Sequence, residues 1–236
     1  IVAHAADAGE AVALPMPDVT ATDDSANAPA LTVNLSGGDS AKVEIPVPDV
    51  TFGMVAVLVN ADGTEEIIKS SVPTEGGIAV TLEDGATVKI VDNSKNFADV
   101  ADTYWGADAV AFASSRELFS GTSADTFTPE GDMTRAMIVT VLARYEGVDT
   151  STGDSWYDAG RDWAMQSGIS DGTGMERSLT REQLATMLWR YAGEPATGGT
   201  VAGYTDASAV SGYATDAMAW AVENGIINGM GDGSLN

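Results

Sequence analysis

The sequence has no cysteine and only one histidine, His4, among its 236 residues. Without cysteine, zinc–thiolate, iron–sulfur and thiol chemistry are excluded. With histidine only at position 4, a Ser-His-Asp triad in the body of the chain is excluded too. No nucleophile–base pair, phosphate-binding loop or metal cluster stands out. We therefore expect no enzyme activity, no cofactor and no metal site in these residues.

Basic residues are also scarce, with 11 Lys and Arg against 35 Asp and Glu, a formal net charge of −24. Such a chain repels nucleic acid and anionic lipid, so neither is an expected partner. No apolar run reaches 18 residues, and we expect no membrane insertion. A simpler role for the acidic surface is to keep an exported protein soluble. All four lysines precede residue 96 and all seven arginines follow it, which indicates two halves of different origin.

The first residues resemble the end of a secretory signal. Ala3-His4-Ala5 has the small-x-small pattern of a cleavage site, so we interpret residues 1–5 as the remnant of a signal peptide and expect a secreted protein. An ordinary alanine-rich tail is the alternative. Residues 6–29 are rich in Ala, Asp, Thr and Pro and predict an extended leader, with one strand at 12–16.

Residues 30–95 predict a small β-sandwich. Short β-branched or alternating runs lie at 31–35, 43–47, 54–59, 66–70, 78–82 and 87–91, and Gly-, Asp- and Asn-rich turns separate them. Asp62-Gly63 predicts a hairpin between the runs 54–59 and 66–70. No acid pair or aromatic platform stands out here, so the expected role is that of a spacer or interaction module.

From residue 97 the apolar period changes to that of helices, and a repeat becomes visible. Taking Trp105, Trp156 and Tyr213 as anchors, a glycine follows each after sixteen residues, at Gly121, Gly172 and Gly229. An aromatic residue and an alanine also recur seven and eight residues after each anchor. The spacing predicts three repeats, at 97–147, 151–193 and 204–236, the third truncated.

Each repeat is predicted to begin with a helix that runs from the anchor aromatic to a glycine turn. Gly168 and Gly225 suit the left-handed position that ends a helix. The first two repeats continue with a second helix that starts at Thr134 or Thr180. Thr180 and Gln183 have the spacing of a capping box.

Three groups of residues resemble one known family. The first repeat has Phe97-Ala98-Asp99-Val100, Phe127-Thr128-Pro129 and Thr134-Arg135-Ala136, the second has Thr180-Arg181-Glu182, and the third has Tyr204-Thr205-Asp206. This pattern resembles the S-layer homology module found in exported proteins of Gram-positive, gut Clostridia-like bacteria. The resemblance implies an α+β fold in separate domains, in which an N-terminal small β-sandwich precedes α-helical helix–loop–helix repeats. The repeats would form a pseudo-threefold spindle with grooves between them.

The resemblance also implies a function, namely non-covalent anchoring of a secreted protein at the cell surface, in the cell wall or S-layer. The partner would be a secondary cell-wall polysaccharide carrying pyruvate ketals, or a peptidoglycan-linked glycan. In the family, the arginine pairs with the pyruvate carboxylate. Carried over by position, the polymer-binding residues are Asp99, Trp105, Gly121, Thr134, Arg135, Trp156, Gly172, Thr180, Arg181, Asp206, Tyr213 and Gly229.

The sequence departs from the family pattern in several places. The second repeat has no F-x-D-V, Met137 replaces the acid of T-R-A-E, and the third repeat has no arginine. From the residues alone, the threonines could serve only as caps and the arginines could pair with the chain's own carboxylates. Two further alternatives are a self-assembling structural S-layer subunit and the anchor of a larger surface enzyme whose catalytic domain lies elsewhere. Residues 228–233 lack the alternating acids of a calcium loop.

Overall fold

The computed structural model describes residues 2–4, 18–22, 30–35 and 39–235. The chain divides into two compact units, Ile1–Glu130 and Gly131–Asn236, and each is described by itself. The boundary lies inside the first predicted repeat. Its first helix therefore belongs to the first unit and its second helix to the second unit.

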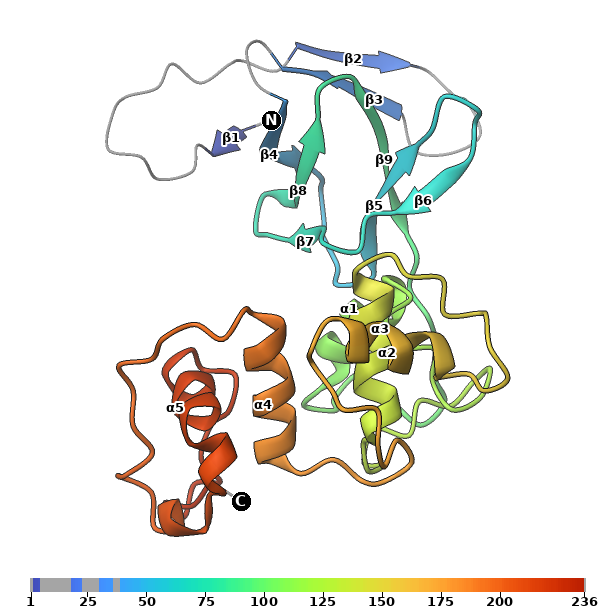
Figure 1. The fold of residues 1–236 in the computed structure, drawn as a ribbon. Coiled ribbons are helices and arrows are strands. Elements are labelled where there is room, and N and C mark those ends of the chain that lie inside the picture. The colour runs from blue at the N-terminus through green and yellow to red at the C-terminus, as the bar shows by residue number, and fades with distance from the viewer. Residues whose placement is uncertain (1, 5–17, 23–29, 36–38, 236) are drawn as a thin grey trace. The chain divides into compact units, whose positions relative to one another are not determined.

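The first unit contains two antiparallel sheets (Figure 1). One has the order β1 (Val2–His4), β4 (Ser40–Pro46), β8 (Gly77–Glu83) and β7 (Val72–Pro73). The other has the order β2 (Asp18–Thr22), β3 (Ala30–Asn34), β9 (Ala86–Asp92), β5 (Met54–Val59) and β6 (Glu65–Ile67). Both sheets contribute to one core, which includes Val43, Ile45 and Val80 from the first and Val33, Ala56 and Val88 from the second. The predicted β-sandwich is confirmed, and the strand expected at 12–16 lies outside the described residues.

The predicted hairpin is confirmed as the antiparallel pair β5–β6. Gly63 in its turn has a φ of +83°, a backbone conformation that glycine adopts without strain. The second strand is shorter than the expected run of 66–70 and ends at Ile67. The chain turns there, since the Ser71 amide donates to the Ile68 carbonyl at 3.0 Å.

The helix α1 (Ala107–Ser115) is tied to this sandwich by the residue that follows it, Arg116. The Arg116 side chain is fully buried, and its Nε donates to the Ser71 carbonyl at 2.8 Å. Its Nη1 and Nη2 donate to the carbonyls of Phe52 and Met54, both at 3.1 Å. The guanidinium also lies 3.8 Å from the ring centre of Phe112. Burial lowers the pKa of Arg116 to about 10.

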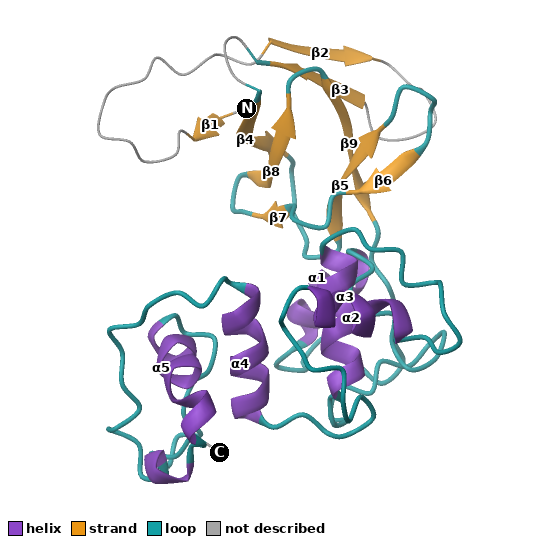
Figure 2. Ribbon diagram, viewed as in Figure 1, coloured by secondary structure: helices purple, strands orange, loops and turns teal. Residues whose placement is uncertain are grey.

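The second unit is helical, with α2 (Arg135–Tyr145), α3 (Asp158–Gln166), α4 (Arg181–Tyr191) and α5 (Thr215–Glu223) (Figure 2). Two short 3-10 turns, Ala207–Ala209 and Gly212–Ala214, precede α5. Helix α2 packs on α3, and α4 packs on α5. No helix in the described part of the chain is both long and apolar enough to cross a membrane.

The first helix of each repeat begins two residues after the anchor aromatic, whereas the spacing predicted that it begins at the anchor. Helices α1, α3 and α5 each have nine residues, and the residue after each anchor is the N-cap, which still lies outside the helix. The predicted glycine ends are confirmed, with φ of +73° at Gly168 and +67° at Gly225. In the first repeat Glu117 occupies the same position with a φ of +57°.

The second helices begin one residue later than predicted, because the threonines are their N-caps. Thr134 Oγ1 accepts from the Met137 amide and Thr180 Oγ1 from the Gln183 amide, both at 3.3 Å. The Gln183 side-chain oxygen Oε1 in turn accepts a hydrogen bond from the Thr180 amide at 3.3 Å, so the capping box is confirmed. Arg135 and Arg181 are thus the first residues of α2 and α4. The pseudo-threefold spindle stays a prediction, since its first repeat spans the boundary between the two units.

Candidate functional site

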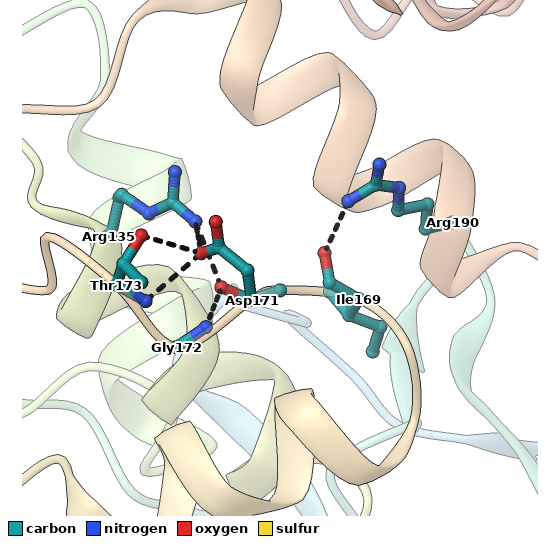
Figure 3. A network of polar contacts seen from close by, with 7 residues as sticks. Arg135, Ile169, Asp171, Gly172, Thr173 and Arg190 are labelled. Carbon is teal, nitrogen blue, oxygen red and sulfur yellow. Dashed lines mark hydrogen bonds and ion pairs between the residues drawn. The ribbon is translucent and has the colours of Figure 1, made fainter.

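Arg135 contacts the loop that carries the glycine of the next repeat. Its Nη2 donates to Ser170 Oγ at 3.1 Å and to Asp171 Oδ1 at 2.8 Å (Figure 3). The same Oδ1 accepts from the amide and the hydroxyl of Thr173, both at 3.0 Å. The hydrogen bond from the Thr173 amide and the nearby charge of Arg135 lower the pKa of Asp171 below its usual value. A charged carboxylate therefore faces Arg135 at neutral pH.

Arg181 makes the corresponding contact one repeat further on. Its Nη2 donates to the carbonyl oxygen of Asn228. Asn228 precedes Gly229, as Asp171 precedes Gly172, so both arginines contact the same position of the following loop. In both side chains Nε is buried and has no hydrogen-bond partner among the described residues. The repeat sequence thus produces the same geometry twice, with a carboxylate partner in one case and a neutral partner in the other.

Two pockets in the second unit bring predicted residues together. A pocket of about 390 Å³ is lined by Arg135, Asp171 and Tyr213, which come from three successive repeats, and also by Arg190. A smaller pocket of about 240 Å³ is lined by Thr180, Arg181 and Asp206. Five of the predicted polymer-binding residues therefore line one of these two pockets.

The three anchor aromatics are exposed, as a stacking platform for a sugar requires. The exposed fractions are 88% for Trp105, 55% for Trp156 and 55% for Tyr213. Trp156 packs edge-on against the Tyr157 ring with centroids 5.3 Å apart. The Tyr213 hydroxyl donates to Glu182 Oε1 at 3.0 Å, which orients that ring beside the Arg135 pocket.

The predicted site residues Asp99 and Asp206 each accept a hydrogen bond from a loop later in the same repeat. Asp99 accepts from the amides of Phe127 and Thr128 at 2.9 and 2.7 Å, and the Phe127 bond is the main cause that lowers the pKa of Asp99. Asp206 likewise accepts from the Leu235 amide at 2.8 Å. Asp99, Trp105 and Gly121 all belong to the first unit, so they are not part of the two pockets of the second unit.

The loop glycines have close neighbours, and Gly121 and Gly172 also have a positive φ that favours glycine. A Cβ at Gly121 would lie 2.9 Å from the Phe97 ring, and one at Gly229 would lie 2.9 Å from the Tyr204 ring. A Cβ at Gly172 would lie 2.3 Å from the Met165 sulfur. Gly172 and Gly229 belong to the loops that Arg135 and Arg181 contact, and a direct role in polymer binding stays a prediction for all three glycines.

Sequence reasoning missed the partners of the arginines. Asp171 stands directly before the recurring glycine, so its position next to Gly172 was a usable signal. Arg190, in the last turn of α4, donates to the Ile169 carbonyl at 3.4 Å and lines the same pocket as Arg135. Glu182 accepts from Ser211 and Tyr213, and nothing in the repeat spacing pointed to it.

Comparison with known proteins supports the family. The family model of the S-layer homology domain matches residues 96–136 and 203–236. An endoglucanase of Bacillus sp. (strain KSM-635) is 28% identical over 170 residues, which is 65% of this chain and 18% of that protein. Cell surface glycoprotein 1 of Acetivibrio thermocellus is 43% identical over 49 residues, 21% of this chain and 2% of that protein. An exoglucanase of the same organism is 28% identical over 174 residues, 65% of this chain and 16% of that protein.

The chain spans less than a fifth of the length of these relatives. No solved structure gives a significant match. S-layer homology domains bind cell-wall polysaccharide and attach the proteins that carry them to the cell wall, at the cell surface. The recurring anchors and the capped second helices agree with this match: the chain carries S-layer homology repeats at residues 96–136 and 203–236.

Proposed function

We propose that the second unit binds an anionic cell-wall polysaccharide, without catalysis, by holding a carboxylate of the glycan at Arg135. A ketal-linked pyruvate supplies such a carboxylate. The observation that carries the proposal is the pocket of about 390 Å³, which is lined by both Arg135 and the exposed ring of Tyr213. A charged donor and a flat apolar face are the two groups that an acidic sugar requires.

The position of Arg135 favours an anion. It is the first residue of α2, where the helix dipole favours negative charge, although the amides of Arg135 and Ala136 already donate to the carbonyls of Arg177 and Met175. A guanidinium has five N–H donors, and the hydrogen bonds of Arg135 to described residues all use Nη2. Donors therefore remain for a ligand oxygen, even with Asp171 in place.

Arg181 provides a second site of the same kind. Its partner is the Asn228 carbonyl, so no direct ion pair neutralises it in the described part of the chain. The pocket around it also contains the apolar side chains of Val210, Met218 and Leu235. We propose that Arg135 and Arg181 hold successive acidic groups of one polymer or of two neighbouring polymers.

The experiment is cosedimentation of the whole chain with purified cell walls, before and after the wall polysaccharide is extracted. Arg135→Ala and Arg181→Ala should each weaken binding about tenfold, the loss of one charged hydrogen-bonded contact. Arg161→Ala is the matched control, because Arg161 pairs with Asp158 and Asp162 on α3, away from both pockets. Binding of the Arg135→Ala, Arg181→Ala double variant at the wild-type level would refute the proposal.

A second proposal concerns the protein to which the chain belongs. Two of the relatives bear the names of glucan-cleaving enzymes, and the chain matches less than a fifth of each. This supports the hypothesis that the chain is the part of a larger surface enzyme that attaches the enzyme to the cell wall. Recovery of the native protein from the cell surface tests it: a mass well above 24.2 kDa together with glucan hydrolysis is expected. A native protein of about 24.2 kDa that does not hydrolyse glucan would contradict it.

A further inference from the structure

A third pocket in the second unit contains none of the predicted polymer-binding residues. It has a volume of about 430 Å³ and is lined by Glu146, Trp163, Ser167, Ile169, Arg190 and Tyr191. Glu146 follows the last residue of α2, Tyr191 ends α4, and Trp163 lies on α3. The pocket thus lies where the ends of two helices meet the side of a third.

The lining combines aromatic rings with two side chains of opposite charge, Glu146 and Arg190. The rings of Trp163 and Tyr191 are 6.4 Å apart and tilted by 58°. The Tyr191 hydroxyl donates to Glu146 Oε1. Burial, and then this bond, raise the pKa of Tyr191, so the hydroxyl keeps its proton and remains a donor.

This set of groups suits an uncharged sugar. The apolar face of a sugar ring packs on an aromatic side chain, and Trp and Tyr offer such faces at small cost in side-chain entropy. The exposed Glu146 carboxylate has lone pairs left to accept from sugar hydroxyls, and the exposed Arg190 has donors for them. The opposite charges of Glu146 and Arg190 give the pocket no net preference for an anion.

The pocket adjoins the Arg135 site. Both pockets are lined by Ile169 and Arg190. Arg190 donates to the carbonyl of Ile169, and Arg135 donates to the side chains of the next two residues, Ser170 and Asp171 (Figure 3). Two residue steps of extended chain cover at most about 7 Å. The residues that contact Arg190 and Arg135 are thus close together on one loop, which places the two pockets side by side for neighbouring sugars of one glycan.

We propose that this pocket, the aromatic subsite, binds an uncharged sugar residue of the wall glycan, next to the acidic residue held at Arg135. The inference rests on the proposed function, since it extends the same glycan along the Ile169–Asp171 loop. The aromatic subsite adds selectivity for the sugar beside the acidic one. A guanidinium alone does not supply that selectivity, because it recognises only the carboxylate.

The test uses the whole chain and oligosaccharides released from purified walls, separated into fragments of one acidic sugar and of two or more sugars. Isothermal titration should show wild-type affinity about tenfold higher for the longer fragments. Glu146→Gln and Tyr191→Phe should reduce that ratio about three- to tenfold, as expected for one hydrogen bond, and leave the single-sugar affinity unchanged. Glu176→Gln, an exposed carboxylate outside the pocket, is the control.

The outcomes separate the two proposals. An unchanged ratio in both Glu146→Gln and Tyr191→Phe would overturn the aromatic subsite, even if Arg135→Ala abolishes binding of every fragment. Undiminished binding by Arg135→Ala would instead refute the carboxylate site, and the ratio would still report on the subsite. Trp163→Phe provides a second variant that keeps an aromatic ring, and a reduced ratio is expected there too. Thermal unfolding confirms that each variant is folded.

Discussion

Nη2 of Arg135 lies 2.8 Å from Oδ1 of Asp171, so the first residue of one repeat's second helix is ion-paired with the following repeat's loop. The Asp171 side chain is 66% exposed, whereas that of Arg135 is 19% exposed. The chain thus places its own carboxylate where a glycan carboxylate is expected. A ligand must share the guanidinium with Asp171 or displace it.

Asp171→Asn should strengthen binding to an anionic glycan. The substitution removes a negative charge that competes for Arg135, and an exposed ion pair is worth up to about 1 kcal/mol, or roughly fivefold in affinity. Titration with the single acidic sugar measures the effect, with Asp154→Asn as the control for charge alone. Weaker binding by Asp171→Asn would show that Asp171 positions Arg135 and does not compete with the ligand.

Arg116→Met should destabilise the first unit by about 2–4 kcal/mol. The change removes the Arg116 donors from the carbonyls of Ser71 and Met54, while the Phe52 carbonyl keeps only the Ser115 hydroxyl, and buried unsatisfied acceptors are costly. Urea unfolding followed by circular dichroism measures it. Arg161→Met, which removes a more exposed arginine from the second unit, should change stability by less than about 1 kcal/mol. Equal effects of the two substitutions would mean that Arg116 does not hold α1 on the sandwich.

Glu117→Gly should stabilise the chain by about 0.5–1 kcal/mol. Glu117 has a φ of +57°, and only glycine adopts the left-handed region without steric cost. Gly168 and Gly225 occupy the same position, with open space where a Cβ would be, so Gly168→Ala and Gly225→Ala should each cost about 1 kcal/mol. Thermal melts of the three variants provide the comparison. A lower melting temperature for Glu117→Gly would show that contacts of the Glu117 side chain stabilise the chain by more than its backbone conformation costs.

Stability should depend on pH through Asp99. Hydrogen bonds from the amides of Phe127 and Thr128 lower its pKa in the folded chain. A carboxylate with a lowered folded pKa contributes stability that is present above the unfolded pKa of about 3.9 and is lost as pH falls through the folded pKa. Asp99→Ala should therefore be less stable than the wild type at pH 7, and the gap should narrow below about pH 4. A gap that is constant with pH would contradict the role of Asp99 as a loop acceptor, and Asp102→Ala controls for the lost charge.

The sequence was most informative where structure is local. Repeat spacing and capping chemistry located the helices within two residues, since a Thr180–Gln183 box and a glycine end act over three or four positions. The β-runs were found for the same reason, because alternation is a property of each strand. Strand β7, of two residues, was too short to produce such a signal, and β1 and β2 fall in segments that were interpreted as a signal remnant and an extended leader.

Long-range contacts were not predictable in this way. The sandwich carbonyls that accept from Arg116 lie 45 to 64 residues away in sequence, and the sequence placed Arg116 simply among the arginines of the repeats. The aromatic subsite likewise needs Glu146 and Tyr191, which are 45 residues apart. Nothing in the sequence pattern connects these two residues, and only the folded chain shows that they line one pocket.

The most direct test of the central claim combines two changes, loss of the Arg135 side chain and removal of pyruvate from the wall. Binding of the whole chain is measured for wild type and Arg135→Ala on native and on depyruvylated walls. If Arg135 holds that carboxylate, each change alone weakens binding about tenfold and the two together weaken it no further. Independent effects, in which the two losses multiply, would show that Arg135 and the pyruvate do not meet.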